Sequence, residues 1–145
     1  MARELGVDGL VVPVGWLDGD ELQAAYAATD VFVTPSICFD TYGMVNLEAM
    51  EHAKPVVATT FGGSREVVED GRNGLLCNVR DAADLADKML QFIDLSPEAR
   101  VRMGRESRAK VEREFDEQIV IDRYLEVIDE ILSATTPRSV VQAPP

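Results

Sequence analysis

Short runs of apolar residues alternate along this chain with longer stretches in which apolar side chains recur at helical spacing. This alternation restricts the folds that the chain can adopt. The runs that we interpret as strands are residues 10–14, 31–34, 56–58 and 75–77. Strands that are apolar along their whole length are typical of a parallel sheet with both faces buried. We therefore predict an α/β fold, a three-layer Rossmann-like domain with a parallel sheet.

Capping residues mark where several of the connecting helices should begin. Asp18, Asp81, Ser96 and Asp116 are suitable N-cap residues, and a proline follows Ser96. The expected helices are 18–29, 44–52, 62–69, and three that start near 81, 96 and 116. We assign residues 1–132 to one partial domain, and we predict that residues 133–145 form a disordered tail, since they show no hydrophobic periodicity.

The charge and composition of the chain exclude some classes of function. Its 145 residues carry a net charge of -12, so a nucleic-acid partner is not expected, because binding nucleic acid requires a basic surface. The first residues lack the apolar core of a signal peptide, and no run approaches the roughly 20 apolar residues that cross a bilayer. We expect a cytoplasmic protein, which as part of a longer enzyme could lie against a membrane.

Three loops should meet where the predicted strands end, which is where open parallel sheets bind their ligands. They are residues 15–17, 35–43 and 61–63. In the second loop Gly43 precedes a helix start, so its backbone can approach a ligand closely. The main-chain N–H groups of Met44, Val45 and Asn46 should then point at the rim, where a diphosphate could accept their hydrogen bonds.

Two carboxylates flank this helix start, Asp40 and Glu48, with seven residues between them. Glu48 can accept two hydrogen bonds from a ribose diol, and Asp40 can accept one from a sugar hydroxyl. The simpler alternatives are that Asp40 is a loop acid or cap and that Glu48 is a solvated helix residue. Trp16 is either a partly buried anchor or a platform for a nucleobase, and Arg65 either reaches a phosphate or forms a surface ion pair.

Together these segments resemble a known family. Residues 25–36, 40–58, 61–66 and 70–76 are similar to the retaining glycosyltransferases of family 4, which have the two-domain GT-B fold and an E-x7-E motif. The resemblance extends over about residues 2–132 and implies that the chain is a truncated C-terminal half of a GT-B fold, the donor-binding domain. The resemblance implies that Glu48 binds the ribose of the donor. It also implies that Asp40 contacts the transferred sugar or steadies the loop around that sugar. It further implies that Gly43, Met44 and Val45 contact the phosphates and the sugar. Gly62 and Gly63 would line the donor cleft, and Trp16 and Leu17 would lie beside the nucleobase.

The function implied by this resemblance is transfer of a sugar, with retention, from a UDP-, GDP- or ADP-sugar to a hydroxyl of an acceptor glycan, lipid or small molecule. No cofactor or metal is expected. Asp40 and Ala53 depart from the family pattern, which has glutamate and glycine there. The family's Gly-Arg and Lys-Gly segment and its N-terminal domain are not in this sequence, so we expect this chain alone to be inactive. Self-association through its last helix is a further expectation.

Two other functions remain open from the sequence. The first is a non-catalytic module that binds a nucleotide sugar or docks on a partner. The second is a sugar-nucleotide epimerase, which would need a general base that the sequence does not reveal.

Overall fold

The fold is built on a sheet of three parallel strands. The computed structural model describes residues 2–39, 41 and 43–135. Strands β1 (Phe32–Thr34), β2 (Val56–Thr59) and β3 (Gly74–Cys77) lie in the order β1-β2-β3. Val56 is in register with Phe32 on one side and with Gly74 on the other. The predicted α/β class with a parallel sheet is confirmed.

Helices connect and extend this sheet. Two of the predicted caps are made by side chains, because Asp81 accepts a hydrogen bond from the Asp84 amide at 3.0 Å and Ser96 accepts one from the Ala99 amide at 3.2 Å. At the start of α1, by contrast, the Asp18 side chain makes no capping hydrogen bond. The helices are η1 (Asp8–Leu10), α1 (Gly19–Ala28), α2 (Met44–Glu51), α3 (Ser64–Val67), α4 (Ala82–Asp94), α5 (Pro97–Glu114) and α6 (Glu117–Thr135).

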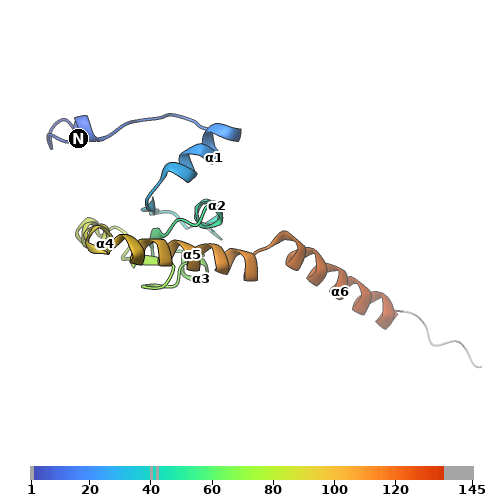
Figure 1. Ribbon diagram of the computed structural model, residues 1–145. Helices are drawn as coiled ribbons and strands as arrows, with labels where there is room; N and C mark the ends of the chain where they lie inside the picture. Colours follow the sequence, from blue (N-terminus) through green and yellow to red (C-terminus); the bar gives the residue numbers. More distant parts are fainter. Residues whose placement is uncertain (1, 40, 42, 136–145) are drawn as a thin grey trace, which may run out of the picture.

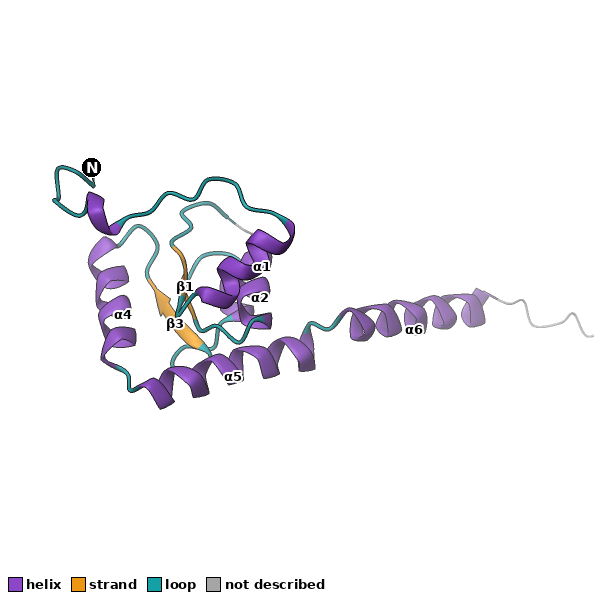
Figure 2. Ribbon diagram, turned by 45° about the horizontal axis from the view of Figure 1, so that its top comes forward, coloured by secondary structure: helices purple, strands orange, loops and turns teal. Residues whose placement is uncertain are grey.

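Helices cover both faces of the sheet, with α5 contributing to each, and this gives the predicted three layers. Successive side chains of a strand point to opposite faces. Val56 and Ala58 therefore pack with residues of α1, α2 and α3, whereas Val57 packs with Phe92 of α4 and Met103 of α5. Figure 2 shows the sheet between α4 on one side and α1 with α2 on the other. Because both of its faces are covered, β2 is buried along its whole length.

Helix α5 closes one side of the domain and packs against α2. Lys110 of α5 has only 8% of its side chain exposed, and its Nζ lies 2.7 Å from Oε1 of Glu69. This hydrogen bond to Lys110 is the main reason why the pKa of Glu69 is below its usual range. The Ser107 hydroxyl donates to the carbonyl of Asn73 at 2.7 Å. These contacts join α5 to the turn that leads into β3.

The strand predicted at residues 10–14 is not formed, and that prediction was wrong. Residues Asp8–Leu10 form a short 3-10 helix, and the segment from Val11 to Asp18 is extended but unpaired. A strand needs a neighbouring strand to accept its hydrogen bonds, and β1 pairs only with β2 among the described residues. Figure 1 shows this segment passing outside the body of the domain before it enters α1.

Helix α6 leaves the body of the domain and projects away from it (Figures 1 and 2). It continues through Thr135, so the helix ends later than the predicted boundary at 132, and the rest of the predicted tail lies outside the described residues. Within the described part of the chain, none of the helices combines the length and the apolar character of a membrane-spanning segment. The apolar face of α6 remains exposed and includes Ile121, Tyr124, Leu125, Ile128, Ile131 and Leu132.

Ala53, just after α2, provides a test of backbone strain. Its φ is 55°, in the left-handed region, where a Cβ is unfavourable. We predict that Ala53→Gly stabilises the chain by about 0.5–1 kcal/mol, measured by urea unfolding. The matched control is Ala24→Gly on the exposed side of α1, which should destabilise by about 1 kcal/mol. A loss of stability in the Ala53 variant would contradict the left-handed conformation.

Gly104 of α5 provides a test of how closely α5 approaches α2. A Cβ at this position would lie 2.0 Å from the Ala53 carbonyl oxygen. We therefore expect Gly104→Ala to force the helices apart and to lower the free energy of unfolding by about 1–3 kcal/mol. Gly9→Ala is the control, since a Cβ there meets no atom within 4 Å. Equal stability of the two variants would show that the helices are not in close contact.

Candidate functional site

The loops that follow β1 and β2 meet at the side chain of Asn46, near the start of α2. Asn46 is 1% exposed. Its Oδ1 accepts a hydrogen bond from the Thr34 hydroxyl at 2.7 Å, and its Nδ2 donates to Oγ of Ser64 at 3.4 Å. One buried amide therefore connects the end of β1, the first turn of α2 and the start of α3. Of the three strand-end loops that were predicted to meet, the loop after β1 and the loop after β2 do so.

Gly43 is required by the geometry of this junction. Its φ of 65° and ψ of 49° place it in the left-handed region at the N-cap of α2. A Cβ here would lie 2.9 Å from Nδ2 of Asn46 and 3.7 Å from Oγ of Ser64. Any larger residue would therefore be strained and would push Asn46 away. Both the left-handed backbone conformation and the close packing therefore explain why this position is a glycine.

The main-chain amides at the start of α2 differ in their availability. The Asn46 amide donates to the Gly43 carbonyl at 2.8 Å, so the expectation that Asn46 offers a ligand-facing amide was wrong. Met44 and Val45 have exposed side chains, and within the described part of the chain no capping side chain accepts from the first turn. The helix dipole adds positive potential at this end. An anion would therefore meet the Met44 and Val45 amides first.

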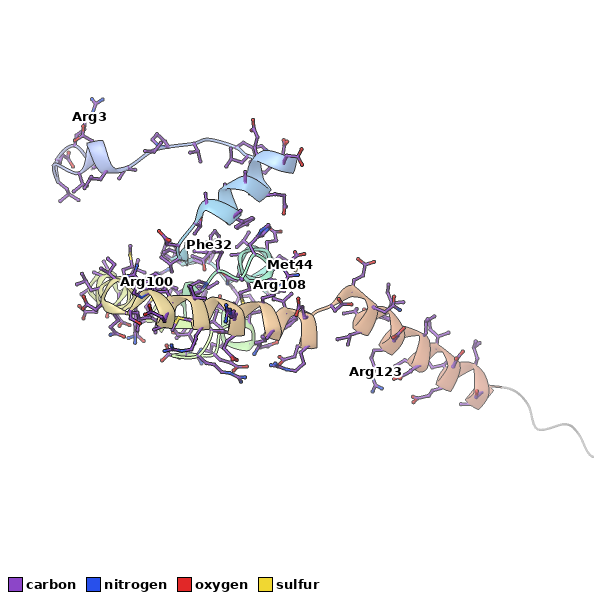
Figure 3. The ribbon with its side chains drawn as sticks, viewed as in Figure 1. Arg3, Phe32, Met44, Arg100, Arg108 and Arg123 are labelled. Atoms are coloured by element: carbon purple, nitrogen blue, oxygen red, sulfur yellow. The ribbon has the colours of Figure 1, made fainter. Side chains whose placement is uncertain are left out.

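Glu48 lies one turn further along α2 and borders a cavity of about 570 Å³. Met44 and Arg108, both labelled in Figure 3, line this cavity from α2 and α5. Arg108 is already bonded, because its guanidinium donates to the Glu51 carbonyl at 2.7 Å and to Glu112 at 2.7 Å. The complete lining is Met44, Leu47, Glu48, Glu51, Arg108, Val111, Glu112, Phe115, Asp116 and Glu117. The cavity thus has an apolar floor and an acidic rim.

Glu48 is not simply a solvated helix residue. It is half-buried, and its Oε2 accepts a hydrogen bond from the Tyr26 hydroxyl of α1 at 2.8 Å. Burial of Tyr26, followed by its hydrogen bond to Glu48 and the charge of that carboxylate, raises the pKa of Tyr26 to about 12. The phenol therefore remains protonated and keeps donating to Glu48 at any physiological pH.

Gly62 and Gly63 border a second hollow at the same end of the sheet, with a volume of about 370 Å³. Gly62 has a φ of 70°, so the loop can turn sharply there. Phe39 and Phe61 contact each other edge to face, with ring centroids 5.8 Å apart. Arg65 lines the same hollow and donates from Nε to the Thr60 carbonyl at 3.0 Å. That hydrogen bond stabilises the loop that contains Arg65. Whether Arg65 reaches a phosphate or has a surface role stays open, as in the sequence analysis.

The remaining predicted residues lie elsewhere. Trp16 is 90% exposed and Leu17 is half-buried in the extended segment before α1, and neither lines the two hollows at Glu48 and at Gly62. Asp40, the predicted first acid, lies outside the described residues, so its role stays a prediction. Among the described residues, no group of three or more histidine, cysteine, aspartate or glutamate side chains is placed to hold a metal ion.

The sequence and the fold of the chain match those of known proteins. The sequence profile of the family described as "Glycosyl transferases group 1" matches residues 1–94. The chain belongs to this family. Two curated relatives of this group 1 chain are a D-inositol 3-phosphate glycosyltransferase of Corynebacterium aurimucosum and a glycogen synthase of Mycobacterium tuberculosis. They are 39% identical over 104 residues and 37% identical over 107 residues, covering 72% and 74% of this chain.

Solved structures show the same fold. A sucrose-phosphate synthase from Thermosynechococcus elongatus matches with a TM-score of 0.82 and 27% identity over 92% of this chain. HepE of Anabaena, solved in complex with UDP-glucose, matches with a TM-score of 0.79 and 26% identity over 89% of this chain. The fold is therefore that of part of a GT-B glycosyltransferase.

This group 1 chain is much shorter than the proteins that it matches. It spans 24% and 25% of the two curated relatives. It spans 33% and 35% of the two solved chains.

Two residues of the site were missed by sequence reasoning, Asn46 as a side chain and Tyr26 as the partner of Glu48. A signal existed for Asn46, because it shares the helix face of Met50, four residues on, which is buried. A polar residue on a buried face needs partners. No comparable signal existed for Tyr26, whose partner is 22 residues away.

We predict that Asn46→Leu destabilises the chain by about 1–3 kcal/mol, because the hydroxyls of Thr34 and Ser64 lose their shared partner. The measurement is urea unfolding, with the exposed Asn78→Leu as control. Amide NMR should also show displaced signals for Gly43 and Ser64 in the Asn46 variant only. Wild-type stability and unmoved signals would contradict the role of Asn46 in joining the loops.

Proposed function

We propose that this chain is the donor-binding part of a glycosyltransferase that transfers a sugar from a nucleotide-diphospho-sugar to an acceptor hydroxyl with retention. The observation that carries this proposal is the position of Glu48 beside a cavity that begins at Met44, directly after the left-handed Gly43. A helix start suits a diphosphate, and a carboxylate one turn away suits a ribose diol. The complex of HepE with UDP-glucose supports a ligand of this class.

The charges around the site indicate how such a ligand would be oriented. Acidic side chains at Glu51, Glu112, Asp116 and Glu117 border the far part of the cavity, and they would repel a diphosphate. The Met44 and Val45 amides, by contrast, lie at the positive end of α2. The diphosphate is therefore assigned to the helix start and the uncharged ribose to Glu48.

The proposed chemical role follows from the same amides. As the bond between the sugar and the diphosphate breaks, negative charge develops on the departing oxygen. Donors that are already oriented toward this oxygen stabilise the transition state more than the ground state. Main-chain N–H groups at the α2 start are fixed by the helix and by Gly43, so they need little reorganisation. The acceptor and the remaining catalytic groups are assigned to other parts of a longer enzyme, by resemblance to the family.

A non-catalytic module that binds a nucleotide sugar is the alternative function. The acidic rim of the cavity, in which Arg108 is already bonded to Glu51 and Glu112, favours weak binding. Binding without sugar transfer in a protein that also contains the partner domain would support this alternative.

The direct test is protein-observed NMR of the chain during titration with UDP-, GDP- and ADP-glucose. We expect millimolar binding, with shifts at Gly43, Met44 and Glu48. Preference among the three donors would identify the nucleobase. Shifts confined to α4, α5 and α6 would contradict the proposed position of the ligand.

A substitution at Glu48 tests the ribose contact. Glu48→Ala should weaken binding of the preferred donor by about 1–3 kcal/mol, because two hydrogen bonds to a charged acceptor are lost. The matched control is Glu130→Ala on the projecting helix α6, which should bind like the wild type. An unchanged dissociation constant for Glu48→Ala would remove Glu48 from the site.

A further inference from the structure

The carboxylate of Glu48 is fixed from outside its own helix. The Tyr26 hydroxyl of α1 donates to Oε2 of Glu48 at 2.8 Å. Within the described part of the chain no partner is recorded for Oε1, the second oxygen of this carboxylate. Glu48 also borders the cavity that begins at Met44. One oxygen is thus engaged by the protein, and the other can meet a ligand.

Tyr26 is itself held in place by the rings of two other side chains, one of which is fixed by a third residue. The residue is only 6% exposed. It contacts the ring of Phe32 at 5.5 Å with a tilt of 59°, and it stacks on the ring of His52 at 5.6 Å with an angle of 17°. His52 is hydrogen-bonded in turn to Gln23 at 2.8 Å. Contacts from α1, β1 and the end of α2 therefore leave the phenol little freedom to move.

The pair behaves as a fixed donor and acceptor. A glutamate on a helix surface samples several rotamers, and ordering it on binding costs affinity. A buried phenol that never ionises at physiological pH removes part of this cost before the ligand arrives. The raised pKa of Tyr26 agrees with such a permanent donor.

We propose that Tyr26 is a positioning residue for nucleotide binding, which orders Glu48 so that its second oxygen accepts from the ribose hydroxyls. This inference rests on the proposed function and names the residue that prepares the ribose contact. It predicts that the effect of Tyr26 on affinity requires the ribose hydroxyls, since Tyr26 acts only through Glu48. A purely structural role of the tyrosine would affect all ligands alike.

The test compares two probes, UDP and 2′,3′-dideoxyuridine 5′-diphosphate, in the wild-type chain and in Tyr26→Phe. Dissociation constants come from NMR titration. We expect the wild type to prefer UDP and Tyr26→Phe to bind UDP roughly fivefold more weakly. The dideoxy probe should bind both proteins alike. The matched control is Tyr124→Phe, which removes the hydroxyl of an exposed tyrosine on α6 and should leave both constants unchanged.

The outcomes separate this inference from the proposed function. If the wild type prefers UDP and Tyr26→Phe keeps that preference in full, the positioning role is overturned while the nucleotide site stands. If the wild type binds neither probe, or binds them outside α2, the proposed function fails and this inference fails with it. An equal loss for both probes would show a structural role and would overturn the inference.

A second measurement tests the same pair if Tyr26→Phe folds poorly. In the wild-type chain, the carbon that bears the phenol oxygen of Tyr26 should have an NMR shift typical of a strong hydrogen bond to a carboxylate. Glu48→Gln, which keeps the size of the side chain and removes its charge, should move that shift toward the value of the exposed Tyr124. An unchanged Tyr26 shift in Glu48→Gln would overturn the proposed contact.

Discussion

Strand β2 is covered by helices on both faces, and Val56, Val57 and Ala58 are completely buried. A strand of this kind pairs stably with parallel neighbours on each side, here β1 and β3. Parallel pairing in turn places the carboxyl ends of all three strands at one edge. The connections that return from that edge must begin there, and α2 is such a connection. The position of the proposed site is thus a consequence of how β2 is buried.

Under the proposed function, local features of this edge are what an anion and a sugar would meet. The left-handed Gly43 is the N-cap of α2, and the Asn46 side chain bonds to Thr34 on one side and to Ser64 on the other. The chain carries a net charge of -12, so attraction of an anionic ligand must be local. The end of a helix supplies such a local potential through oriented main-chain dipoles, without basic side chains.

Much of this arrangement could be predicted from sequence, because it depends on short-range patterns. Three of the four apolar runs, caps such as Asp81 and Ser96, and the glycine before α2 are local signals that led to elements that the structure contains. The strand expected at residues 10–14 failed because a strand depends on its neighbours, which a local pattern does not reveal. The hydrogen bond between Tyr26 and Glu48 was missed for the same reason. The hydrogen bond from the Asn46 amide to the Gly43 carbonyl was also not predicted. It depends on how tightly the first turn of α2 is wound, which residue types do not specify.

The central claim is that the start of α2 binds the diphosphate of a nucleotide sugar. The most direct measurement is a crystal structure of this chain grown with UDP at a concentration well above its dissociation constant. We expect phosphate oxygens within hydrogen-bonding distance of the Met44 and Val45 amides, with the ribose hydroxyls at Glu48. A well-ordered nucleotide bound away from α2, with its phosphates in contact with other elements, would contradict the account.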